Sequence, residues 1–64
     1  MLSGLNELKG KEVEIRYLES ITAIPSKAKG VITKIAVDNT VTFIILDNGE
    51  AINTRFISKI TVIN

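Results

Sequence analysis

The chain has 64 residues with 8 basic and 7 acidic side chains, a formal net charge of +1, and neither histidine nor cysteine. A chain of this length has room for one hydrophobic core, so we expect a single domain over residues 1–64. Without cysteine and histidine the chain can form neither disulfides nor thiolate zinc sites and lacks the commonest metal ligand, so we expect no metal, no cofactor and no enzymatic activity. The small net charge is unlike that of a strongly basic nucleic-acid binder.

The first predicted elements are a helical turn and a strand. Residues 3–9 favour one short helical turn, because two leucines lie three positions apart on one face. Residues 11–18 alternate between apolar and polar side chains, which is typical of a half-buried strand. The residues expected to point inward from this strand are Val13, Ile15 and Tyr17.

The middle of the chain predicts a long loop followed by a bent strand. Residues 19–29 break the alternation, and Pro25 cannot occupy a central strand position, so we interpret this segment as a loop. Alternation resumes at Gly30 and continues to Val37. A glycine in a strand commonly marks a bulge or bend, because no Cβ crowds the curved backbone. We therefore expect the strongest bend of the sheet at Gly30.

Two turn signals flank the apolar segment at residues 40–46. The first is Asp38-Asn39, which predicts a tight turn. The second is Asp47-Asn48-Gly49, which predicts a hairpin, because Asn and Gly tolerate the positive φ angles of short hairpin loops. The segment between them should therefore pair with the strands on both sides.

Three strands complete the predicted fold. The strand at residues 40–46 has apolar side chains on both faces, so we expect it to be central, with Phe43 pointing inward. Further strands are expected at residues 50–56 and 60–63, with a 3₁₀ turn at residues 56–59 between them. Together these elements predict an all-β fold, a small barrel of five strands with one short N-terminal helical turn.

In this order of elements the chain resembles the Sm-like family, including its bacterial Hfq type. The resemblance is carried by the Leu5-Asn6-Glu7-Leu8 turn, by Gly30-Val31-Ile32, and by Arg55-Phe56-Ile57-Ser58-Lys59-Ile60 before the last strand. Ala36 stands where the family has an aspartate, and Arg55 is the matched residue of its second signature. The resemblance implies an Sm-like or SH3-like barrel that assembles as a homo-oligomer and binds single-stranded RNA.

The candidate RNA-binding residues are Arg55, Asn39 and Lys34. The guanidinium of Arg55 can both hydrogen-bond a base and stack on it, and an amide such as that of Asn39 can read a base edge. Asn39 also suits the turn that contains it, and lysines such as Lys34 also serve as solvated charges that protect edge strands. For Asn39 and Lys34 the RNA-binding role and the structural role are both open.

The chain has three aromatic residues, and each has two interpretations. They could stack on RNA bases, or they could pack in the hydrophobic core. Alternation places Tyr17 and Phe43 on inward faces, which favours the core for those two, whereas Phe56 lies at a turn and is undecided.

A protein-protein interaction module is the alternative function. In an SH3-like barrel, the loop at residues 19–29 would display Ile21 and Ile24 to a protein partner. Self-association is expected, because neither a disulfide nor a metal can stabilise so small a domain. No apolar run is long enough to span a membrane and no signal peptide is visible, so we expect a cytoplasmic protein without membrane contact.

Overall fold

The computed structural model describes residues 2–19 and 21–63, so Met1, Ser20 and Asn64 lie outside the described part of the chain. The elements in chain order are the 3₁₀ helix η1 (Leu2–Leu8), the strands β1 (Glu12–Leu18), β2 (Pro25–Asp38), β3 (Val41–Leu46) and β4 (Ala51–Asn53), the 3₁₀ helix η2 (Thr54–Phe56), and the strand β5 (Ile57–Val62). The predicted all-β class, with five strands after a short helical segment, is confirmed.

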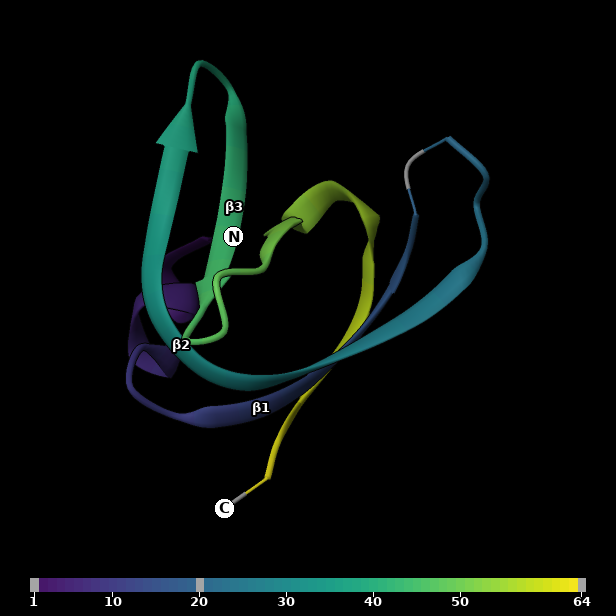
Figure 1. The fold of residues 1–64 in the computed structure, drawn as a ribbon. Coiled ribbons are helices and arrows are strands. Elements are labelled where there is room, and N and C mark those ends of the chain that lie inside the picture. Colours follow the sequence, from purple (N-terminus) through teal and green to yellow (C-terminus); the bar gives the residue numbers. More distant parts are fainter. Residues whose placement is uncertain (1, 20, 64) are drawn as a thin grey trace.

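The five strands form one antiparallel sheet in the order β4-β3-β2-β1-β5. Strand β2 is long enough to pair with β1 along its first half and with β3 along its second half. Between the two halves β2 curves strongly, so the sheet folds back over itself (Figure 1). Within the described residues no ladder joins β4 to β5, so each of these strands leaves one edge of the sheet unpaired.

The bend in β2 follows Gly30, as the sequence predicts. Beyond Gly30 the strand changes its pairing partner, and the register shifts between Ile32 and Lys34. Backbone groups of other segments converge there: the Ile32 carbonyl accepts from Gly10 N–H at 2.8 Å, and the Val31 carbonyl accepts from Asp47 N–H at 2.8 Å. The bend is therefore fixed by hydrogen bonds from both neighbours of β2.

The predicted loop at residues 19–29 is wrong in its second half, because β2 begins at Pro25. Pro25 is the first residue of β2 and lies in the half that pairs with β1 alone, a position that tolerates the missing N–H. Before it, Glu19 N–H donates to the Ile24 carbonyl at 3.0 Å, and Ala23 N–H donates to the Glu19 carbonyl at 2.8 Å. The partner strand, which local sequence does not reveal, decides where β2 begins.

Both predicted turns are confirmed, and the second 3₁₀ helix lies earlier than expected. Asn39 has φ +57° in the turn before β3, and Gly49 has φ +90° in the hairpin before β4. The helix η2 begins at Thr54 because the Asn53 side chain accepts a hydrogen bond from Arg55 N–H at 2.9 Å. This cap ends β4 after three residues, so β5 begins at Ile57 in place of the predicted residue 60.

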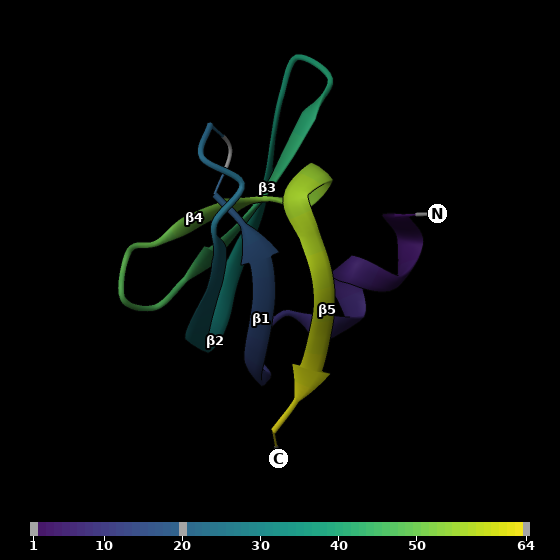
Figure 2. The same ribbon diagram turned by 90° about the vertical axis from the view of Figure 1, so that its right-hand side faces the viewer.

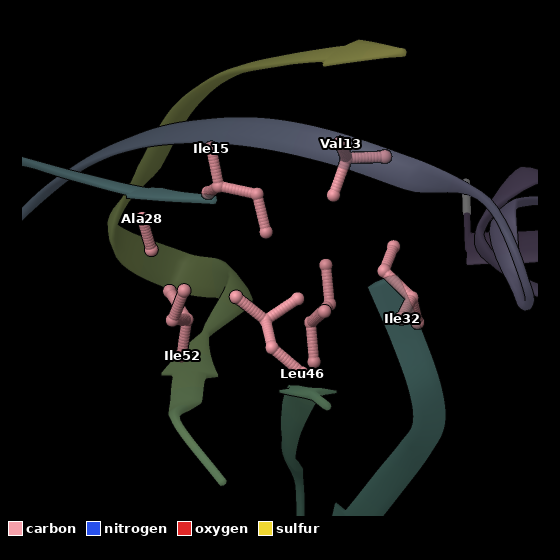
Figure 3. Packing of buried hydrophobic residues seen from close by; sticks show 7 residues of the cluster. Val13, Ile15, Ala28, Ile32, Leu46 and Ile52 are labelled. Atoms are coloured by element: carbon pink, nitrogen blue, oxygen red, sulfur yellow. The ribbon is translucent and has the colours of Figure 1, made fainter. Parts of the chain in front are cut away.

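The core lies inside the fold of the sheet and is aliphatic. Its side chains converge from β1, β2, β3 and β4 (Figure 3). The buried residues are Val13, Ile15, Ala28, Ile32, Ile44, Leu46 and Ile52. On β3 the buried face carries Thr42, Ile44 and Leu46, so the expectation that Phe43 points into the core is wrong: Phe43 is half-buried on the other face.

Candidate functional site

Arg55 lies on η2, between the last two strands, and its side chain is exposed. Its backbone is held by the Asn53 cap, which leaves the guanidinium to extend from a fixed turn. Within the described part of the chain both ion pairs involve Glu14, and neither includes Arg55. The guanidinium is therefore available to an anion or a base.

The turn that contains Asn39 leads into the start of β3, and Arg55 lies beside that start although it comes 16 residues after Asn39 in the sequence. A small hollow of about 160 Å³ is lined on one side by the start of β3 from Thr40 to Thr42, and on the other side by Asn53, Thr54 and Arg55. Asn39 immediately precedes this lining and is exposed. Arg55 therefore lies beside the start of β3, and Asn39 lies in the turn that leads to it, outside the lining of the hollow.

Lys34 lies away from this turn. It is exposed on β2, opposite Ile45, whereas the β2–β3 turn follows five positions later. At about 3.3 Å per residue, that separation along the strand is about 16 Å. Lys34 can contact a long ligand that also reaches Arg55, but it does not line the same hollow.

A larger hollow, of about 370 Å³, contains all three aromatic residues of the chain. Tyr17 comes from the end of β1, Phe43 from β3 and Phe56 from η2, and each is half-buried. Asn53 lines both this hollow and the small one, so the aromatic hollow directly neighbours Arg55. The sequence does not predict that these three side chains lie together, because they come from segments up to 39 residues apart.

Two other classes of site have no support in the described residues. Residues 2–19 and 21–63 contain no group of three or more Asp, Glu, His or Cys side chains that could hold a metal ion. In the same residues no helix has the length and apolar character needed to cross a membrane.

Comparison with protein-family models, with curated proteins and with solved structures finds no match to this chain. The resemblance to the Sm-like family therefore depends on the order of elements and on the residues named above.

Proposed function

We propose that this chain is a non-enzymatic Sm-like barrel protein that assembles as a homo-oligomer in the cytoplasm and binds single-stranded RNA. Three structural features support the barrel: an N-terminal helical segment, the strand order β4-β3-β2-β1-β5, and a 3₁₀ turn between β4 and β5. The strong curvature of β2 brings the two ends of the sheet toward each other (Figure 1).

The observation that carries the proposed RNA binding is the gathering of all three aromatic side chains beside Arg55. Aromatic rings stack on unpaired bases, and each such contact contributes about 1–3 kcal/mol. The hollow is open and half-lined by apolar atoms, which suits a flat base better than a folded protein surface. Arg55 would pair with a phosphate or base edge, and a longer strand of RNA would reach Asn39 in the β2–β3 turn and Lys34 on β2.

Self-association is supported by the two unpaired edges. Strands β4 and β5 each expose backbone N–H and C=O groups, and pairing β4 of one copy with β5 of another would satisfy both edges. Such a head-to-tail contact closes into a ring when the rotation between copies allows it. The same contact would bury apolar surface of Val62 and Ile63, which are each 41% exposed at the C-terminal end of the sheet.

Sedimentation at micromolar protein concentration is expected to give a species several times heavier than the 7.0 kDa chain. Edge pairing and burial of apolar surface should together favour the assembly over the free subunit. A folded species of 7.0 kDa alone would contradict the oligomer.

Replacing Arg55 with alanine is expected to weaken the binding of oligouridine and oligoadenine by about tenfold or more, since a good arginine contact is worth about 1–3 kcal/mol. The control is Lys11→Ala, because Lys11 is also exposed but lies before β1 and lines neither hollow. Titrations at two salt concentrations should show binding that falls as salt rises. Equal affinities for the two variants would remove Arg55 from the site.

The SH3-like interaction module remains a second candidate, and one observation favours it. At the tip of the β1–β2 hairpin Ile21 is 95% exposed, Ile24 54% and Leu18 41%. Three aliphatic side chains at one tip are typical of a surface that meets a protein partner. A monomer or dimer that fails to bind RNA at low salt would favour this module over the Sm-like ring.

A further inference from the structure

A row of three positive charges crosses the outer face of the sheet. On this face, opposite the core, Arg16 of β1 lies directly opposite Lys27 of β2 and directly opposite Lys59 of β5. All three side chains are exposed, and the three strands lie side by side (Figure 2). Neighbouring strands are about 4.8 Å apart, so the row places three cations within about 10 Å. Lys29 adds a fourth cation two residues along β2.

Within the described residues these charges are only partly compensated, by the single carboxylate of Glu14, which also lies directly opposite Lys29 in the pairing of β1 with β2. Glu14 is the carboxylate nearest to the row: its Oε1 lies 4.0 Å from Arg16 Nε and its Oε2 lies 3.7 Å from Lys27 Nζ. Among the described residues Lys59 and Lys29 form no ion pair. Like charges directly opposite one another destabilise a sheet. The row is therefore unfavourable for the isolated fold and becomes favourable when an external anion lies across it.

We propose that this basic face, formed by Arg16, Lys27, Lys29 and Lys59, binds the phosphate backbone of single-stranded RNA without reading its sequence. The inference rests on the proposed RNA binding and adds a second contact surface, separate from Arg55 and the aromatic hollow. All four cations are exposed, and Arg16 and Lys27 line an open hollow of about 590 Å³ on this face, which suits an extended polyanion. Sequence-independent contact follows because all four groups are cationic, without an amide or aromatic group among them.

The proposed RNA binding favours a chain of phosphates over a lipid surface as the bound anion. Of the exposed aliphatic residues, Leu18 lines the same open hollow as Arg16 and Lys27, whereas Ile21 and Ile24 lie in the connection between β1 and β2. A flexible chain of phosphates can follow the face alone.

The test compares two double variants that remove the same charge. Lys27→Ala with Lys59→Ala removes two cations from the row, and Lys9→Ala with Lys11→Ala removes two exposed cations near η1. Each protein is titrated with oligouridine over a series of salt concentrations. For single strands each lost phosphate contact should reduce the slope of log affinity against log salt by about 0.7, so the row variant should lose about 1.4 and bind at least tenfold more weakly at low salt. The control should retain the parent slope.

Several outcomes would overturn this proposal. They are an unchanged slope in the row variant, an equal change in both double variants, and a parent protein that does not bind oligouridine at low salt. Vesicles of phosphatidylglycerol provide a further arm: loss of vesicle binding alone would assign the row to lipid instead. Arg55→Ala tests the aromatic site separately, so a loss confined to that variant would retain the proposed function and reject the basic face. Unchanged circular dichroism of the row variant would show that its fold is retained.

Discussion

Replacing Ile44 with alanine is expected to lower the free energy of unfolding by about 2–5 kcal/mol. Ile44 is fully buried in the middle of β3 and pairs with Ile52, so truncation would leave a cavity in the centre of the aliphatic core. At about 0.05–0.15 kcal/mol per residue, a domain of this size has a total stability of about 3–10 kcal/mol. The variant should therefore lose a large share of its total stability.

Urea unfolding followed by circular dichroism measures this effect. Protein concentration must be held constant, because an assembly would add concentration-dependent stability. Ile44→Val should cost only about 0.5–1.5 kcal/mol, since it removes a single methyl group. Val37 is 68% exposed on β2, so Val37→Ala should change stability by no more than about 0.5 kcal/mol. A comparable loss in Val37→Ala and Ile44→Ala would contradict the position of the core.

Replacing Gly30 with valine is expected to cost about 1 kcal/mol, because the added side chain must displace the Asp47 carboxylate from its hydrogen bond. A Cβ on Gly30 would lie 2.7 Å from Asp47 Oδ1 and 3.5 Å from Leu46 Cβ. The first contact is too short, and moving the Asp47 carboxylate would break the hydrogen bond that it accepts from Val31 N–H at 3.3 Å. Steric crowding at the bend, and not a positive φ angle, is thus the reason for glycine at this position.

A double-mutant cycle with Asp47→Ala separates the crowding from other effects. If the carboxylate is the obstacle, Gly30→Val should cost less in the Asp47→Ala background than in the parent. Gly4→Val is the control, because a Cβ at Gly4 would have no neighbour within 4 Å. Unfolding midpoints in urea give all four corners of the cycle. Equal costs at Gly4 and Gly30, or strict additivity with Asp47→Ala, would show that the bend does not depend on this close approach.

The local features of the fold were predictable because their causes lie within a few adjacent residues. Alternation of polar and apolar side chains predicted β1, and the turn residues predicted the turns at Asn39 and Gly49. The absence of a side chain at Gly30 predicted the bend there. The start of β2 was not predictable in this way, although Ser26-Lys27-Ala28-Lys29 alternates small and charged side chains. Pro25 argued against a strand there, because proline lacks the backbone N–H of a central strand residue. In the fold Pro25 is the first residue of β2 and pairs only with β1, a position that tolerates the missing N–H.

Local sequence was enough to predict an all-β chain with five short strands and with Arg55 near a turn. Only the tertiary structure decided which side chains meet. It placed Arg55 beside the start of β3, gathered the three aromatic rings, and aligned Lys27, Arg16 and Lys59 in one row. Turns and alternation depend on neighbouring residues, whereas cross-strand contacts depend on the register in which residues up to 49 positions apart pair.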